Sequence, residues 1–392
     1  NLIMPFLMGI SALGFMIGTG GSAIVAKTLG EGKIENANEY FSMLVYITAI
    51  GGIIIAILSM FLVKPVAILF GASGTLLDNC ILYGRILCIS LPAFMLQNVF
   101  QSFFVTAEKP HLGLRVIVIA GVTNMVLDFL FVAVFHLGLP GAGLATVCGE
   151  FIGGLFPLFY FGRKNSSLLK LGKTHFHGRI LLKTCTNGSS ELMTNLSSSV
   201  VNALYNMQLM KFAGEDGVAA YGTIMYVNFI FVSIFFGYAI GSAPIVSYHY
   251  GANNQDELKN LFHKSIRLIG TWAVSLFIIA QLIATPLATL FVGYDQGLFE
   301  LTRSGFRLYS FAFLINGFNI YGSAFFTALN NGLLSALISF LRTLVFQMAV
   351  VLLLPLLLGI NGVWCSVAIA ELLTLCVTGT FIVLKRNTYH YL

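Results

Sequence analysis

Residues 138–150 read GLPGAGLATVCGE, and residues 359–371, which lie 221 positions further along the chain, read GINGVWCSVAIAE. Both stretches begin with a glycine, have another glycine three residues on and end with an acid. The same offset aligns other residues that are informative in an apolar chain, among them Gly20 with Gly241, Gly30 with Gly251, Pro65 with Pro286, Gly84 with Gly305, Asn98 with Asn319 and Ser102 with Ser323. One register for all of these pairs indicates a duplicated unit. Duplication in a hydrophobic chain is typical of secondary transporters.

The composition of the chain is that of a polytopic membrane protein. Of its 392 residues, 57% are hydrophobic and only 9% are charged, and the mean hydropathy is +0.89. A soluble domain carries about 25% charged residues. The net charge of +6 lies between apolar segments and indicates membrane topology instead of nucleic-acid binding. The six cysteines show no CxxC spacing, so the sequence predicts neither disulfides nor a metal site.

Apolar runs long enough to cross a bilayer follow one another through the chain. They predict about eleven transmembrane helices, near residues 2–28, 41–70, 79–106, 113–137, 141–162, 186–212, 218–247, 264–292, 301–328, 333–358 and 361–385. We therefore expect an all-α polytopic membrane protein made of two six-helix lobes. Because six is an even number, both lobes enter the membrane in the same orientation, which predicts a parallel pseudo-twofold repeat.

The duplication also predicts where the lobes begin and end. We expect an N-terminal lobe at residues 1–164, a basic linker at 165–185, a C-terminal lobe at 186–386 and a tail at 387–392. The apolar run at 186–212 precedes the position that matches residue 1, so the first lobe has no copy of this run. We therefore expect the first helix of the complete repeat to be missing from this chain.

The linker is the longest polar stretch, and it predicts the orientation of the protein in the membrane. It is rich in Lys and Arg, and the segment after the last apolar run is also basic. By the positive-inside rule, the linker and the C-terminus should be cytoplasmic, in a protein of the cytoplasmic membrane. The expected partners are the lipid bilayer and small amphiphilic molecules, with no nucleic acid. His175 and His177 of the linker have no further ligand cluster, so we interpret them as solvated loop residues.

Several motifs, in order along both lobes, give the chain a resemblance to a known family. They are residues 18–30 (GTGGSAIVAKTLG), 124–128 (NMVLD), 141–146 (GAGLAT), 339–342 (SFLR) and 362–364 (GVW). Together they resemble the multidrug and toxic compound extrusion (MATE) family of cation-coupled antiporters, over essentially the whole chain. The resemblance implies two six-helix lobes around a central cavity that opens to one side at a time. It also implies export of organic cations or amphiphiles in exchange for H⁺ or Na⁺ by a monomer, with no other cofactor and no catalytic residue.

The resemblance further implies a polar network in the N-terminal lobe that binds the coupling cation. Matched position by position, this network falls on Asn98, Asn124, Asp128 and Thr146. Its remaining acidic member belongs to the first helix, which we expect to be missing here. Coupling by this chain therefore depends on whether the remaining members suffice.

Asp128 is the sharpest candidate for coupling, because apolar residues flank it on both sides. A carboxylate inside the hydrocarbon costs about 3 kcal/mol or more unless it is paired, neutralised or hydrated. Asn124 lies one turn earlier and is expected to hydrogen-bond it, and a purely structural hydrogen bond is the alternative. The positions that match Asn124, Asp128 and Thr146 in the second lobe are Val345, Ala349 and Val367, which favours a role beyond the common scaffold. Asn98 keeps a counterpart in Asn319, so structural and coupling roles both stay open for it.

Four other charged residues lie in or beside apolar runs. Glu150 and Glu371 occupy equivalent places in the two lobes, which favours a scaffold role, although Glu150 follows Thr146 by one turn and could join the network. Arg342 lies midway along an apolar run and needs an acceptor, for which we prefer Glu371. Such pairs usually hold helices together. Glu191 lies among serines at the start of the seventh helix of the family. It is either a functional acid or a hydrated residue at the beginning of that helix.

Amide and phenol side chains of the second lobe are candidates to line a substrate cavity, although most polar residues of a helix bundle serve packing. These candidates are Asn202, Tyr205, Gln208, Tyr226, Asn228, Asn316 and Asn319. A lipid-linked oligosaccharide flippase of the same superfamily is the alternative function, but it would favour a more cationic cavity. A membrane-embedded enzyme is a further alternative, yet the sequence places no His/Asp/Glu or Ser/Lys constellation at one membrane face.

Overall fold

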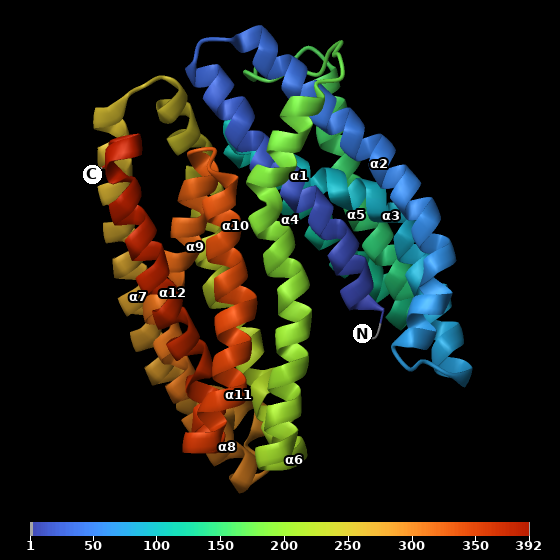
Figure 1. Ribbon diagram of the computed structural model, residues 1–392. Coiled ribbons are helices and arrows are strands. Elements are labelled where there is room, and N and C mark those ends of the chain that lie inside the picture. Colours follow the sequence, from blue (N-terminus) through green and yellow to red (C-terminus); the bar gives the residue numbers. More distant parts are fainter. Residues whose placement is uncertain (1–2, 392) are drawn as a thin grey trace. The chain divides into compact units, whose positions relative to one another are not determined.

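The computed structural model describes residues 3–391, and every regular element within them is a helix, with no strand (Figure 1). The first elements are α1 (Met4–Gly30), α2 (Ile34–Leu69), α3 (Gly74–Thr106), α4 (Pro110–Asp128), η1 (Phe129–Val134) and α5 (Gly138–Gly162). They are followed by α6 (Gly178–Gly251), α7 (Gln255–Val292), α8 (Gln296–Tyr309), η2 (Ser310–Ala312), α9 (Phe313–Ala328), α10 (Gly332–Phe340), η3 (Leu341–Phe346), α11 (Gln347–Leu358) and α12 (Ile360–Tyr389). The segments η1 and η3 are π-helical.

Ten helical segments within residues 3–391 are long and apolar enough to cross a membrane. One of them, α6, has 74 residues and contains two of the predicted spans, at 186–212 and 218–247. Between these spans the backbone leaves the helical conformation at Gly214, with φ 61° and ψ −148°. A residue with a Cβ atom adopts this conformation only with strain, so the break requires a glycine. Once α6 is counted as two spans, the structure matches the predicted series of helices.

The predicted duplication is confirmed by the positions of the helix ends. Helix α1 ends at Gly30 and α6 at Gly251, while α2 begins at Ile34 and α7 at Gln255, so both pairs of ends are 221 positions apart. The chain divides into two compact units, unit 1 with residues 1–195 and unit 2 with residues 196–392. Each unit therefore contains one copy of the repeated helices.

A matched pair of glycines shows why the repeat keeps its register before the last helix of each unit. Gly138 has φ 60° and Gly359 has φ 58°, and both lie at the start of that helix. This left-handed region is readily accessible only to glycine. The glycines quoted first from the sequence thus perform the same conformational task in α5 and α12.

Unit 1 is organised around α3, which packs against α1, α2 and α5. Phe41, Phe100 and Phe161 are fully buried, and the ring centroid of Phe161 lies 5.1 Å from that of Phe41 and 5.6 Å from that of Phe100. Small residues bring the backbones together, because a Cβ atom at Gly154 of α5 would overlap the carbonyl oxygen of Ala93 in α3. Close approach at small residues is a common way for membrane helices to associate.

Unit 2 is organised around α9 and α12, which pack against each other and against their neighbours. Trp364 of α12 is almost fully buried and covers Gly305 of α8, where a Cβ atom would lie 2.8 Å from the indole ring. The π-helical segment η3 also packs against α12. This packing positions polar residues of α9, η3 and α12 next to one another.

The outward faces of both units are apolar, as expected for a protein in lipid. Phe61 of α2 is 72% exposed and Leu357 of α11 is 83% exposed, and many Ile and Leu side chains around them are also exposed. Continuous apolar surface of this kind indicates contact with a membrane or a partner. Together with the apolar spans, it identifies a multi-pass membrane protein.

From α2 onward, the helices begin earlier than hydropathy alone predicts. The first turns of several of them are polar, so they are helical without adding to the apolar run. Helix α7 begins at Gln255, where Asn254 caps it by accepting a hydrogen bond from the backbone N–H of Glu257 at 3.1 Å. Side-chain capping of this type stabilises a helix start. Helix α6 likewise begins at Gly178, so residues 178–185, expected in the linker, are helical.

The non-helical part of the linker lies against the start of α2. The Oδ1 atom of Asn38 accepts a hydrogen bond from the backbone N–H of Lys170 at 2.6 Å, and the Oγ atom of Ser42 accepts one from Gly172 at 3.0 Å. The carboxylate of Glu39 lies 2.9 Å from His175 and 3.1 Å from His177. The two histidines, expected to be solvated loop residues, therefore share a carboxylate partner, and the linker is held on unit 1.

We predict that Gly154→Ala destabilises the protein, because the added methyl group must displace the α3 backbone at Ala93. Overpacking of this kind costs about 1–3 kcal/mol. Thermal unfolding in detergent measures the effect, and Gly121→Ala in α4 is the matched control, because no atom lies within 4 Å of its added Cβ. Equal unfolding temperatures for the two variants would show that α3 and α5 do not depend on this contact.

Candidate functional site

The polar network of unit 1 is formed where α4 and α5 cross. The side-chain amide of Asn124 in α4 donates a hydrogen bond of 3.4 Å to the hydroxyl of Thr146 in α5. Thr146 in turn donates to the backbone carbonyl of Ala142 at 3.1 Å. Gly149 allows this approach, because a Cβ atom there would lie 2.9 Å from the carbonyl oxygen of Ala120.

Asp128 is the last residue of α4, directly before the π-helical segment η1. Its side chain is partly buried, and its Oδ1 atom is buried without a hydrogen-bond partner among the described residues. The prediction that Asn124 hydrogen-bonds Asp128 is therefore wrong for this oxygen, because the Asn124 amide is directed to Thr146 across the helix interface. Single π-helical turns inside α-helices are frequent at functional sites.

A second acid of unit 1, Glu150 in α5, follows Thr146 by one helical turn. Tyr83 of α3 is within electrostatic range of both carboxyl groups, those of Asp128 and Glu150. Ser90 of α3, whose hydroxyl donates to the backbone carbonyl of Leu87 at 3.2 Å, lies close to Glu150. Within residues 3–391, neither acid forms an ion pair. Asn98 of α3 is buried, and its Nδ2 atom has no hydrogen-bond partner in that part of the chain. The structure thus adds Tyr83 and Ser90, which the sequence analysis missed, to this group.

Arg342 and Glu371 of unit 2 form the ion pair that the sequence predicts. The Nε atom of Arg342 in η3 donates to both carboxylate oxygens of Glu371 in α12, at 2.8 and 3.1 Å. The side-chain amide of Asn319 in α9 donates to Oε2 of Glu371 at 2.7 Å and to its backbone carbonyl at 2.8 Å. Glu371 is almost fully buried. A buried carboxylate with a cation and an amide as donors is electrostatically satisfied.

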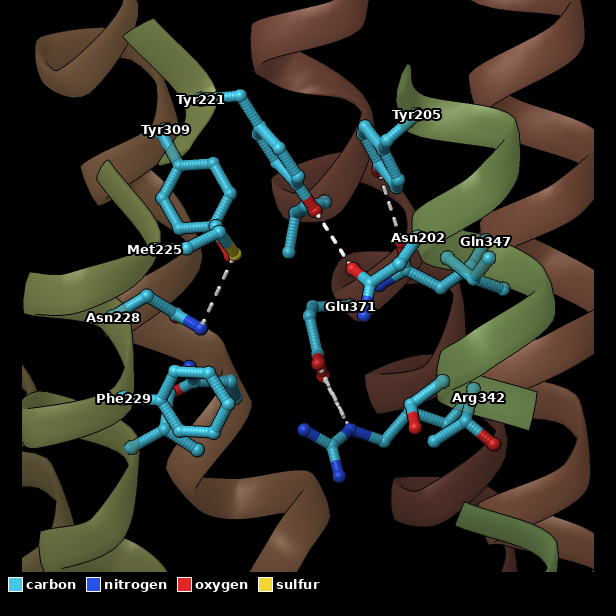
Figure 2. A pocket seen from close by; sticks show the side chains of 16 residues that line it. Asn202, Tyr205, Tyr221, Met225, Asn228, Phe229, Tyr309, Arg342, Gln347 and Glu371 are labelled. Atoms are coloured by element: carbon cyan, nitrogen blue, oxygen red, sulfur yellow. Dashed lines mark hydrogen bonds and ion pairs between the residues drawn. The ribbon is translucent and has the colours of Figure 1, made fainter. Parts of the chain in front are cut away.

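This pair lies in the wall of a pocket of about 220 Å³ in unit 2 (Figure 2). The predicted cavity residues that line it, besides Arg342 and Glu371, are Asn202, Tyr205, Asn228 and Asn316. Residues that the sequence analysis did not single out also line it, namely Tyr221, Met225, Phe229, Tyr309, Thr343 and Gln347. The pocket is thus lined by aromatic, amide and aliphatic side chains, with one ion pair.

Most polar groups of the pocket are hydrogen-bonded to each other. The hydroxyl of Tyr221 donates to Oδ1 of Asn202 at 3.1 Å, and the hydroxyl of Tyr205 donates to Oε1 of Gln347 at 3.0 Å (Figure 2). The rings of Tyr205 and Tyr221 stack with their centroids 5.4 Å apart. This arrangement fixes the phenols and leaves their hydroxyl protons directed at protein partners.

Four other candidates lie outside the lining of this pocket. Gln208 is buried in α6, and Tyr226 is 66% exposed and stacks on Phe291. Asn319 is fully buried behind Glu371. Glu191 belongs to the part of α6 in unit 1, where its backbone carbonyl accepts a hydrogen bond of 2.8 Å from Asn195.

The two units differ in how their matched acids are neutralised. Glu150 and Glu371 are equivalent in the repeat, but the position that matches Arg342 is Gly121 in unit 1. Glu371 therefore has a permanent cation beside it, whereas no basic side chain of the described residues pairs with Glu150 or Asp128. An exchangeable cation would meet acceptors in unit 1 and an occupied position in unit 2. No group of three or more His, Cys, Asp or Glu residues suited to a metal ion occurs in the described part of the chain.

Comparison with known proteins identifies the family. The MatE family model matches residues 1–130 and 192–353, which is most of the chain. The multidrug export protein MepA of Staphylococcus saprophyticus is 22% identical over 98% of this chain and 84% of its own length. That of Staphylococcus haemolyticus is 24% identical over 96% and 82%. A crystal structure of MATE in complex with MaL6 superposes with a TM-score of 0.94 at 22% identity, over 100% of this chain and 88% of that one.

We predict that Arg342→Ala lowers the thermal stability of the protein in detergent, because it leaves Glu371 buried without its cation. Breaking one side of a buried pair costs about 3–5 kcal/mol. The double variant Arg342→Met/Glu371→Gln removes both charges and should recover most of the loss. Arg303→Ala is the control, because its ion pair with Glu300 is partly exposed and exposed pairs contribute at most about 1 kcal/mol. A stability of Arg342→Ala equal to that of the control would contradict the prediction.

Proposed function

Because the chain belongs to the MatE family, we propose that it is a secondary active exporter of organic cations or other amphiphiles. Export is driven by antiport of H⁺ or Na⁺, through alternating access of the two units. Two relatives that match nearly the whole chain are named as multidrug export proteins, which supports amphiphiles as the substrates. The basic linker and C-terminus support a cytoplasmic location for both segments in this proposal.

The unpaired acids of unit 1 are the observation that carries the coupling part of the proposal. Asp128 and Glu150 lie in a membrane-spanning bundle, form no ion pair among the described residues, and Asp128 keeps a buried oxygen without a hydrogen-bond donor. A proton or a sodium ion at Asp128 would supply the missing positive partner. The carboxylate, amide and hydroxyl oxygens of Asp128, Asn124 and Thr146 are the ligand type that a hard cation prefers.

Loading and unloading of this site change the charge of the α4–α5 interface. Without the cation, Asp128 places a negative charge in the hydrocarbon, which favours conformations in which water reaches it. With the cation bound, the charge is neutralised and dehydrated conformations become accessible. A ligand that binds one conformation better than another shifts the populations by its difference in affinity. The corresponding positions of unit 2 are apolar or already paired, so loading acts on one unit only.

We predict that Asp128→Asn abolishes ion-driven export, because the amide cannot exchange a proton or hold a sodium ion by charge. The measurement is ethidium efflux from everted membrane vesicles under separately imposed H⁺ and Na⁺ gradients. Efflux should fall to the level of vesicles without the protein, while the amount of inserted protein stays unchanged.

Asp78→Asn in α3 makes the same chemical change at an exposed position of the same unit and is the matched control, with wild-type efflux expected. Ion-driven efflux at the wild-type rate in Asp128→Asn would refute the assignment of the coupling site. Transport that responds to neither gradient, with either residue at position 128, would refute antiport itself.

A further inference from the structure

The guanidinium of Arg342 has donors that the protein does not use. Only its Nε atom hydrogen-bonds Glu371, and no hydrogen bond joins its two terminal nitrogens to any described residue. Figure 2 shows these nitrogens directed away from the carboxylate, into the open space of the pocket. The side chain is 12% exposed while that of Glu371 is 3% exposed. The ion pair therefore presents its cationic end to the pocket and its anionic end to the protein.

The carboxylate has no comparable free capacity toward the pocket. The Nε atom of Arg342 and the side-chain amide of Asn319 both donate to Glu371. No other acid lines the pocket. A cationic group entering it would meet the arginine without an acid to bind, whereas an anionic group would find a planar pair of N–H donors. Planar pairs of this type match the two oxygens of a carboxylate.

The rest of the pocket suits the apolar body of such a molecule. Met225, Phe229 and Val367 line it together with the ring of Tyr309. The hydroxyls of Tyr205 and Tyr221 are engaged with Gln347 and Asn202, so they do not compete for the anion. A volume of about 220 Å³ can hold a small ring system with a short acidic arm.

We propose that this pocket of unit 2 binds aromatic amphiphiles that carry a carboxylate, with the terminal nitrogens of Arg342 as the recognition group. The inference rests on the proposed export function and refines its substrate class, because it adds carboxylate-bearing molecules to organic cations. Selection by charge then differs between the units: unpaired acids characterise unit 1, and a cation with free donors characterises the pocket of unit 2.

Isothermal titration calorimetry of the detergent-solubilised protein, without any ion gradient, tests the proposal with three probes of one shape. These are 1-naphthylacetate, the neutral 1-naphthylacetamide and the cationic 1-naphthylmethylammonium. The carboxylate should bind at least tenfold more tightly than the other two. Arg342→Lys keeps a positive partner for Glu371 but removes the planar donors, and it should weaken carboxylate binding about tenfold while leaving the amide unchanged. Arg303→Lys, at the partly exposed pair with Glu300, should have no effect.

A second variant keeps the test decisive if Arg342→Lys fails to fold. Thr343→Phe places a ring beside Arg342 in the pocket lining and changes neither residue of the ion pair, and it should lower carboxylate affinity at least tenfold. Equal affinities for the three probes, tighter binding of the ammonium probe, or no effect of the folded variants would overturn the proposal. Because the assay contains no transport step, absent binding with intact ethidium export removes this inference alone. Binding without ion-driven export removes the proposed function instead.

Discussion

A charge inside the hydrocarbon must be paired, neutralised or hydrated, and the two units of this chain meet that requirement differently. In unit 2, Arg342 is a permanent counter-ion of Glu371, and Asn319 adds a further donor. In unit 1 the equivalent acid is Glu150, and the position that matches Arg342 is occupied by Gly121. One copy of the repeat therefore carries its cation covalently, whereas no basic side chain of the described residues pairs with the equivalent acid of the other copy. This asymmetry, built on a symmetric scaffold, is the basis of the functional proposals.

The architecture could be predicted from the sequence because its signals are local or periodic. The matched glycines mark positions where the backbone needs a positive φ, as the φ values of 60° and 58° at Gly138 and Gly359 show. Apolar runs report the spans because backbone groups in lipid must be satisfied within the helix. Helix starts were predicted too late where capped polar turns extend a helix beyond the apolar run, as at Asn254. The break at Gly214 lay between two predicted spans, yet its geometry depends on the structure.

The candidate site could be predicted only in part, because side-chain partners depend on helix rotation and backbone irregularity. The Arg342–Glu371 pair was predictable, since the chain has so few charges within its spans that each one needs an identifiable partner. The Asn124–Asp128 hydrogen bond was predicted from ideal helix spacing, but α4 gives way to a π-helical segment after Asp128 and Asn124 bonds to Thr146. Tyr83 and Gln347 were missed because nothing in a linear pattern shows which face of one helix meets a polar side chain on another.

Helix α2 has 36 residues and is therefore about 54 Å long, whereas the hydrocarbon core is about 30 Å thick. It is therefore longer than the hydrocarbon core requires, and the end that holds Asn38 and Glu39 is the polar end that binds the linker. Because the His175 side chain is 89% exposed, the contact between Glu39 and the two histidines is open to screening by salt, whereas the buried pair of Arg342 and Glu371 is screened much less. The salt concentration of the buffer will consequently act on the linker, and the thickness of the bilayer will act separately on the transmembrane charges.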